Sequence, residues 1–242
     1  MVAFNLEKEE KKVKFVLEKK QIANITAMVS LVLDISGSMK NNYERGIVQE
    51  FFQRTLPVAL NFDDNGELDV FVFSSGKMHA QISPSATRAN YDSYVQKEIL
   101  NNRGIEKWGG TDYAPVTEAL LKEYGFLTKK GGFFGMGGQE VLQASSKKGF
   151  PAICYFITDG ENSDQTETYQ LLKKCQEAHS NIYFLFIGIG REAFRFLKRV
   201  ADDFDNTGFL AIEDLGKSAS DEAFHESLLP DELCTWLGGK KG

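Results

Sequence analysis

The chain has 242 residues, of which 42% are hydrophobic and 26% charged, a globular composition that excludes a disordered, collagen-like or coiled-coil chain. Its 28 basic and 34 acidic residues give a formal net charge of −6, which argues against a general attraction to nucleic acid. The three Cys and three His lie far apart and no pair has zinc-ligand spacing, so any bound metal is expected to have oxygen ligands.

The N-terminal segment is charged and carries no targeting signal. Residues 1–22 form a charged extension in which EKEEKK and EKK flank the apolar patch VKFVL, and we expect a helix or an added strand there. The start of the chain has no hydrophobic segment of signal-peptide type. No apolar run approaches the roughly 18 residues that a membrane-spanning helix requires. We therefore expect a cytoplasmic protein without a membrane span.

Short runs rich in Val, Ile, Phe and Tyr predict the strands of one sheet. Four strands are expected to be buried on both faces, at residues 27–33, 68–73, 152–157 and 182–187. Residues 77–82 follow the second run after Ser-Ser-Gly, a hairpin-like separation that predicts an antiparallel edge strand. Residues 209–212 form a weaker sixth candidate.

Helical periodicity separates these strands. Apolar residues recur at helical spacing over 47–56, 168–179 and 194–200, and a further helix is expected over 111–124. The alternation predicts an α/β fold with a mainly parallel sheet, helices on both faces and right-handed crossovers. Ligands of such folds bind beyond the carboxyl ends of the strands.

Residues 127–150 form a glycine- and phenylalanine-rich insertion. This segment holds six glycines and the side chains of Phe133, Phe134 and Met136. Large apolar side chains on a loop indicate an interaction surface, whereas the alternative is that they fold back onto the sheet.

Hydroxyl and carboxylate groups follow two of the predicted strands. The first strand runs into Asp34, Ser36 and Ser38, and Gly37 between the serines permits a tight turn. The fourth strand ends at Thr158 and Asp159. Oxygen-only ligation of this kind suits Mg²⁺, Mn²⁺ or Ca²⁺.

Another motif, Gly109-Gly110-Thr111-Asp112, precedes the predicted helix. It is the second motif in chain order, and Thr158-Asp159 is the third. Thr111 would lie close to the N-cap, and helix capping alone explains a threonine at that position. Turn and capping chemistry likewise explains each of the other two motifs taken alone. The joint occurrence of the three motifs is what indicates a site.

Together, the three motifs resemble those of the von Willebrand factor A (vWA) domain. The resemblance covers residues 23–237 and implies a three-layer Rossmann-like fold with a six-stranded sheet of order 3-2-1-4-5-6. In that family the motifs form a metal-ion-dependent adhesion site (MIDAS). Carried over by position, Asp34, Ser36, Ser38, Thr111 and Asp159 would be the metal ligands, and each has the expected residue type.

The resemblance implies a function in protein binding. The metal, with Mg²⁺ first and Mn²⁺ or Ca²⁺ as alternatives, would accept an Asp or Glu carboxylate from a protein partner, and the domain would not be an enzyme. The DISGSM motif, the lysine-rich N-terminus and the KKGGFFG segment are most similar to the bacterial tellurium-resistance (TerF-like) type, which implies a role in a stress or tellurium-resistance complex.

Two other classes of function remain open. An Asp after the first strand of an α/β sheet also suits a Mg²⁺-dependent aspartyl-phosphate phosphotransferase or phosphatase. Haloacid dehalogenase-type phosphatases, however, need a second Asp two positions on, where this chain has Ser36. The other alternative is a scaffolding domain with a vestigial metal site. The sequence indicates neither the oligomeric state nor the partner.

Overall fold

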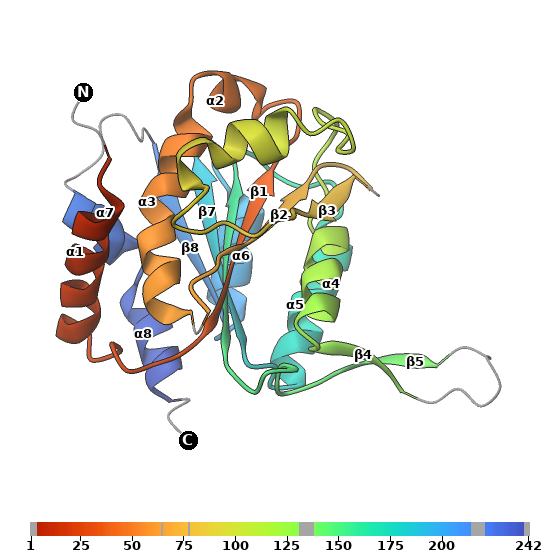
Figure 1. Ribbon diagram of the computed structural model, residues 1–242. Helices are drawn as coiled ribbons and strands as arrows, with labels where there is room; N and C mark the ends of the chain where they lie inside the picture. The colour runs from red at the N-terminus through yellow and green to blue at the C-terminus, as the bar shows by residue number, and fades with distance from the viewer. Residues whose placement is uncertain (1–3, 64, 77, 131–137, 214–220, 240–242) are drawn as a thin grey trace.

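The computed structural model describes residues 4–63, 65–76, 78–130, 138–213 and 221–239. A six-stranded sheet lies at the centre, with helices on both of its faces (Figure 1). Its strands are β1 (Met28–Asp34), β2 (Asp69–Phe73), β3 (His79–Gln81), β6 (Ala152–Thr158), β7 (Ile182–Ile189) and β8 (Thr207–Ile212). The α/β class expected from the sequence is therefore confirmed.

The order of strands in the sheet is β3-β2-β1-β6-β7-β8. All neighbours pair in parallel except β2 and β3, which pair antiparallel. Once the strands β4 and β5, which lie outside this sheet, are set aside, the order is the expected 3-2-1-4-5-6. Every residue of β1, β6 and β7 is buried, as the continuous apolar runs of a sheet covered on both faces require.

Two hydrophobic cores flank the sheet. One contains side chains from the helices α1 (Leu6–Lys19), α3 (Ile47–Phe62), α7 (Asp221–Ser227) and α8 (Asp231–Gly238). The other contains side chains from α4 (Ala114–Glu123), α5 (Gln165–Glu177) and α6 (Arg195–Asp203). Three short helices complete the fold: α2 (Lys40–Glu44), a 3₁₀ turn (Tyr91–Ser93) and a π-helical stretch (Val95–Leu100). No helix of the described residues is both long and apolar enough to span a membrane.

The charged N-terminal extension forms a helix, not an added strand. Helix α1 starts after Asn5, whose side chain accepts a hydrogen bond from the backbone N–H of Lys8. Val13, Val16 and Leu17 are buried in the same core as α3. The helix is therefore part of the packed structure, and the division of the chain at residue 22 stays a prediction.

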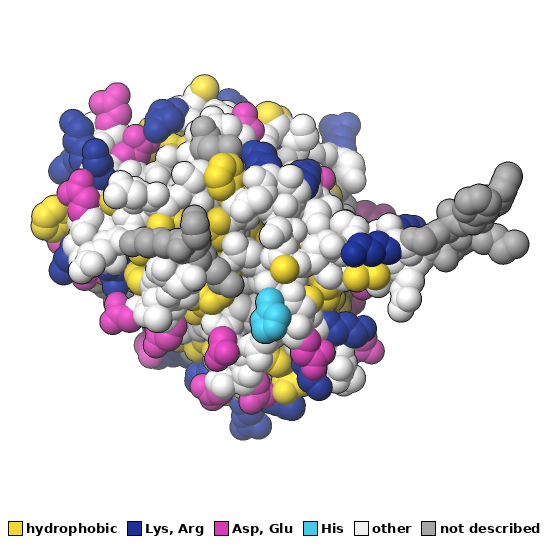
Figure 2. Space-filling model, turned by 90° about the horizontal axis from the view of Figure 1, so that it is seen from below, with side chains coloured by type: hydrophobic (Ala, Val, Ile, Leu, Met, Phe, Trp, Pro, Cys, Tyr) yellow, Lys and Arg dark blue, Asp and Glu magenta, His cyan; other side chains and the backbone are white. Residues whose placement is uncertain are grey.

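The predicted insertion at 127–150 contains a hairpin. Strands β4 (Leu127–Lys130) and β5 (Gln139–Leu142) pair antiparallel and project from the body near the amino-terminal ends of the sheet strands (Figures 1 and 2). Leu127 and Leu142 anchor the base of the hairpin against the second core. The predicted surface residues Phe133, Phe134 and Met136 lie outside the described residues.

Several helix boundaries differ from the expectation. The helix expected from residue 111 begins at Ala114, because the chain from 109 to 112 is held extended against the loops that follow β1 and β2. His179 lies beyond the end of α5 with a φ of 51°, so it is a loop residue. The helices over 91–100, α7 and α8 were not expected, because their short apolar patterns do not complete two turns.

Candidate metal centre

The carboxyl ends of β1 and β6 bring the first and third motifs together. Because β1 and β6 are adjacent and parallel, Asp34 at the end of β1 lies beside Thr158 and Asp159 at the end of β6. The Thr158 hydroxyl donates to Asp34 Oδ2 at 2.7 Å, and the Ser36 backbone N–H donates to Asp34 Oδ1 at 2.7 Å. The Asp34 carboxylate is therefore fixed through both of its oxygens.

Two serine hydroxyls connect the two carboxylates. Ser36 Oγ and Ser38 Oγ lie 3.0 Å apart, and the Ser38 hydroxyl donates to Asp159 Oδ1 at 2.7 Å. Asp34 and Ser36 are buried, Asp159 is half-buried and Ser38 is exposed. We call Asp34, Ser36, Ser38 and Asp159 the carboxylate cluster. It extends from the end of β1 to the protein surface.

The second motif is tied to the first through the backbone. The Gly37 N–H donates to Gly109 O at 2.9 Å, and the Trp108 N–H donates to Ile35 O at 2.8 Å. A Cβ at Gly37 would lie 3.4 Å from Trp108 O and 3.6 Å from Gly109 O, at the short end of ordinary contact. Glycine thus permits the close approach of the two loops, which places Thr111 two residues from a direct contact with the first motif.

Thr111 does not cap the helix that follows it, so the capping interpretation is wrong. The N–H groups of Tyr113 and Ala114, at the start of α4, donate instead to the Asp164 carboxylate at 2.9 and 2.7 Å. The Thr111 carbonyl accepts from the Ser163 N–H at 2.9 Å. Within the described parts of the chain, the Thr111 hydroxyl makes no hydrogen bond, so this oxygen is not committed to holding the fold.

Sequence reasoning missed the carboxylates that support the second motif. Asp112 Oδ2 accepts from the Gly76 N–H at 2.6 Å, and Asp112 Oδ1 accepts from the Ser163 hydroxyl. Asp112 therefore joins the loop after β2 to the loop after β6. Asp164 precedes α5 and reads in sequence as an N-cap of its own helix, but it caps α4 instead. No local pattern indicates such a long-range contact.

Both carboxylates of the cluster are held in an environment that disfavours their charge. Burial raises the pKa of Asp34 to about 6, against the opposing effect of hydrogen bonds from Ser36 and Thr158, and the nearby charge of Asp159 raises it further. Burial also raises the pKa of Asp159, and the charge of Glu192 adds to that rise. Among the residues that the structure describes, no Lys, Arg or His forms an ion pair with Asp34 or Asp159.

The donor set fits a divalent cation with a preference for oxygen. The described residues contain no group of three or more His, Cys, Asp or Glu that could hold a metal, so a site here must use hydroxyls together with carboxylates. The carboxylate cluster offers two carboxylates and two hydroxyls, and Thr111 offers a third hydroxyl from the adjoining loop. Such ligands suit Mg²⁺, Mn²⁺ or Ca²⁺ and are poor ligands for soft metals. A cation would also neutralise two carboxylates that lack a protein counter-charge.

Comparison with known families gives one broad match. A family model described as vWA found in the TerF C terminus matches residues 26–132 and 138–242. The "Uncharacterized protein YcbR" of Bacillus subtilis (strain 168) is 36% identical over 235 residues, which cover 95% of this chain and 85% of that protein. Both similarities extend over most of the domain and are not confined to the three motifs.

Solved structures of low sequence identity share the fold. Proximal thread matrix protein 1 from the mussel byssus is 14% identical with a TM-score of 0.53, and the alignment covers 87% of this chain and 49% of that one. Another structure of the mussel protein, with a zinc-occupied MIDAS motif, has a TM-score of 0.51. Manganese-loaded TRAP protein of Plasmodium vivax is 13% identical with a TM-score of 0.50, covering 87% and 74% of the two chains. This chain thus spans about half the length of the mussel protein.

Proposed function

We propose that this chain, which belongs to the family of vWA domains found in the TerF C terminus, is a protein-binding module that depends on a divalent metal. One observation carries the proposal. Two carboxylates, Asp34 and Asp159, are joined through serine hydroxyls at the carboxyl edge of the sheet and have no protein cation beside them. Two solved structures of the same fold are described as metal-loaded, which agrees with this proposal.

Asp34, Ser36, Ser38, Thr111 and Asp159 would hold the ion, with Mg²⁺ expected and Mn²⁺ or Ca²⁺ as alternatives. When bound, the cation supplies a coordination position that accepts a carboxylate from an Asp or Glu of the partner. The three hydroxyl ligands are neutral, so they leave positive charge available for that carboxylate. Ser38 is exposed, and it marks the surface from which the partner would approach.

The geometry favours binding over catalysis. An aspartyl-phosphate mechanism needs a carboxylate oxygen free to attack a phosphoryl group. Asp34 is fully buried, which keeps a bulky phosphoryl group away from its carboxylate. Each of its oxygens accepts one hydrogen bond and keeps a further lone pair that can contact an ion or its water. We therefore propose that the chain is not an enzyme and that the role of Asp34 is to hold the metal.

The cellular role is proposed from the family alone. The name of the matched family supports a bacterial stress or tellurium-resistance complex. We propose a cytoplasmic protein whose ligand is another protein and not nucleic acid, since the chain has a formal charge of −6. A metal-bound carboxylate is the contact by which such a partner would be recognised.

Thermal unfolding in EDTA and in added Mg²⁺ or Mn²⁺ tests the metal site. At a free metal concentration of 100 Kd, binding stabilises the folded state by about 2.7 kcal/mol, which for a domain of this size raises Tm by roughly 5–10 °C. Asp34→Asn is expected to remove this increase while the protein still folds. Asp69→Asn is the matched control, because Asp69 lies at the opposite end of the sheet and accepts from Tyr124 and Ser85.

Partner capture tests the second half of the proposal. Proteins from a bacterial lysate that are retained by the native chain in Mg²⁺ should be released by EDTA and should not bind Asp34→Asn. A metal-dependent Tm increase that persists in Asp34→Asn would show that the assigned ligands are wrong. Capture that is unchanged in EDTA would remove the metal from the binding mechanism.

A further inference from the structure

We infer that the outer edge of β3 receives an extended segment of the partner as an added strand, beside the metal centre. The inference rests on the proposed function, because it assigns a partner conformation to the same binding surface. Strand β3 is the last strand at one edge of the sheet and pairs with β2 on its inner side (Figure 1). Four features support this assignment: the free backbone groups of β3, the absence of charge and proline in it, the groove beside it and its register with Asp34.

The backbone groups of β3 alternate between β2 and the outside. The Ser74 N–H donates to Met78 O at 2.7 Å and the Ile82 N–H donates to Val70 O at 2.7 Å, and the register pairs Val72 with Ala80. Residues 78, 80 and 82 therefore direct their backbone groups toward β2, and His79 and Gln81 direct theirs outward. No described residue hydrogen-bonds to the backbone N–H or C=O of His79 or Gln81. These four groups form an open hydrogen-bonding row.

The edge of β3 carries one of the usual protections against pairing, its short length of three residues, and lacks the others. Natural edge strands are blunted by short length, by charged side chains, by proline or by a covering element. The sequence from Met78 to Ile82 is MHAQI, which has no charge and no proline. His79 and Ala80 are half-buried and Gln81 is exposed, so the edge is reachable. A short edge without charge or proline permits pairing with a short extended segment, the mode by which strand addition recognises peptides.

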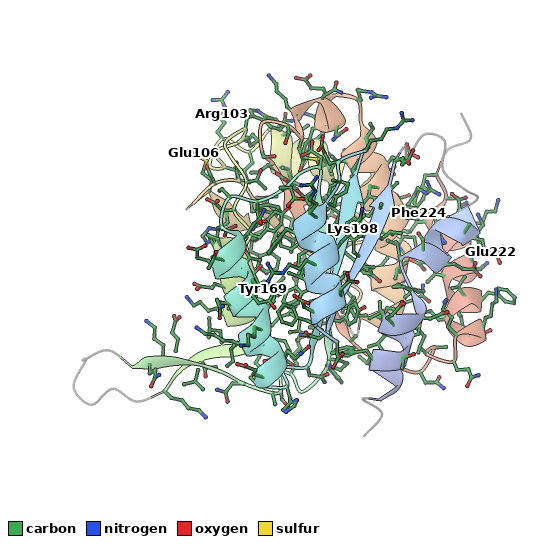
Figure 3. The ribbon with its side chains drawn as sticks, turned by 180° about the vertical axis from the view of Figure 1, so that it is seen from behind. Arg103, Glu106, Tyr169, Lys198, Glu222 and Phe224 are labelled. Atoms are coloured by element: carbon green, nitrogen blue, oxygen red, sulfur yellow. The ribbon has the colours of Figure 1, made fainter. Side chains whose placement is uncertain are left out.

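A groove lies beside residues 78–80 of this edge. It has a volume of about 440 Å³ and is lined by Ser75, Met78, His79, Ala80, Gly104, Ile105 and Glu106. Met78, Ala80 and Ile105 give it apolar walls, while Glu106 is exposed beside it. Figure 3 places Arg103 and Glu106 at the end of the molecule where the strands of the sheet terminate. The groove accommodates small or medium apolar side chains from one face of an added strand.

The register of the sheet links this edge to the metal centre. Asp34 pairs with Phe73, and Phe73 pairs with His79, so the three residues form one row across β1, β2 and β3. With neighbouring strands about 4.8 Å apart, an added strand would lie roughly 15 Å from Asp34. About five extended residues cover that distance. Ser75, which lines the groove, also accepts from the Gly110 N–H at 3.3 Å, one residue before Thr111.

The partner is thus a segment with two parts. One part is a short stretch that alternates apolar and polar residues and pairs with β3. The other is an Asp or Glu about five residues away that reaches the metal. Because only two residues of β3 offer outward groups, pairing alone is weak, and the two contacts strengthen each other through their shared segment. Binding is therefore expected to require both the edge and the metal.

Selection of random 16-residue peptides displayed on phage, with the native protein in Mg²⁺, tests this inference. Selected peptides should contain an acidic residue and an alternating apolar stretch. Gln81→Pro removes one outward N–H and leaves the hydrogen bonds to β2 in place, so it should weaken binding of a selected synthetic peptide at least tenfold. Gln81→Ala, which keeps the N–H, should bind as the native protein does. Both variants should retain the Mg²⁺-dependent increase in Tm.

Hydrogen exchange on the native protein supplies a measurement that needs no variant. Addition of the selected peptide should slow exchange of the His79 and Gln81 amides at least tenfold, whereas the Ala80 amide, already facing β2, should change little. Unchanged exchange at His79 and Gln81, full binding to Gln81→Pro, or a failure to select any peptide would overturn the inference. Binding lost in Gln81→Pro but retained in Asp34→Asn would support the edge and refute the metal-dependent function. Binding retained in Gln81→Pro but lost in Asp34→Asn would support the metal-dependent function and refute the pairing with β3.

Discussion

Two polar clusters in this protein, each with a buried charged group, compensate that charge in opposite ways. The carboxylate cluster at the end of β1 and β6 contains two acids and no protein cation. A second cluster, which we call the ion-pair cluster, lies where α1, α3 and α7 meet and consists of Glu9, Lys12, Arg54, Asp221 and His225. The carboxylate cluster has no positive side chain, whereas Lys12 and Arg54 supply the positive charge in the ion-pair cluster.

The ion-pair cluster is internally neutralised. Lys12 Nζ lies 2.8 Å from Glu9 Oε1 and 2.9 Å from Asp221 Oδ2, and the Arg54 guanidinium lies 3.6 Å from Asp221 Oδ1. Arg54 also stacks 4.1 Å from the ring centre of Phe224 on α7, which Figure 3 labels. These contacts fasten the first helix of the chain to one of the last helices.

The difference distinguishes a structural cluster from a binding cluster. A buried charge needs a partner, because transfer of an unpaired ion out of water is costly. In the ion-pair cluster the opposite charges are built in, so the charges are compensated when the chain folds. The carboxylate cluster has no such partner among the described residues, and under the proposed function a metal ion from solution would supply the missing charge.

Removal of Arg54 should have the largest effect on stability. Arg54→Ala deletes a buried cation and its contact with Phe224, and we expect a loss of about 3–5 kcal/mol in the free energy of unfolding. The matched change in the other cluster is Asp34→Asn, which removes an unpaired buried charge with little change of shape. In EDTA it should alter stability by less than about 1 kcal/mol. Urea unfolding measures both, and equal losses would erase the contrast between the clusters.

Acid should weaken the ion-pair cluster through His225. Burial lowers the pKa of His225 to about 4 from an ordinary value of 6.5, although its hydrogen bond to Arg54 O and the charge of Asp221 oppose the shift. The unfolded chain therefore binds the proton first, and stability should fall by roughly 3 kcal/mol as the pH drops from 6.5 to 4.

A variant isolates this effect from the titration of carboxylates. His225→Gln keeps a donor for Arg54 O and has no proton to gain in this range. Its stability, measured by urea unfolding between pH 4 and 7, should depend less steeply on pH than that of the native protein. The same slope in both proteins would assign the acid sensitivity to other groups.

Loss of Asp164 should have an intermediate effect that reaches the carboxylate cluster indirectly. Asp164→Ala leaves the Tyr113 and Ala114 N–H groups at the start of α4 without their cap, which costs about 1–2 kcal/mol. The loop that carries Thr111 would then be held less firmly, and metal affinity should fall roughly tenfold. Asp164→Asn keeps one acceptor and should lose less of both. An Asp164→Ala protein with native metal affinity would show that the cap does not position the loop.

The fold and the proximity of the site residues were largely predictable from the sequence. The side chains that hold the loops of the site in place were not. Continuous apolar runs such as 152–157 predict buried parallel strands, and strand adjacency then brings Asp34 and Asp159 together. The capping role of Asp164 and the bridging role of Asp112 depend on contacts between distant loops, for which no periodicity exists. The ion-pair cluster was missed for the same reason, since its residues lie on three helices, α1, α3 and α7, that are far apart in the sequence.

Thr111 provides the smallest expected change in stability and the sharpest test of the proposed ligands. In the part of the chain that the structure describes, its hydroxyl makes no hydrogen bond, so Thr111→Ala should change the stability of the metal-free protein by less than about 0.5 kcal/mol. If the hydroxyl contacts the ion, the same variant should bind Mn²⁺ roughly tenfold more weakly by calorimetry, and Thr111→Ser should restore the affinity. A large loss of stability in EDTA would make Thr111 a structural residue. Native affinity in Thr111→Ala would leave the ion to the carboxylate cluster alone.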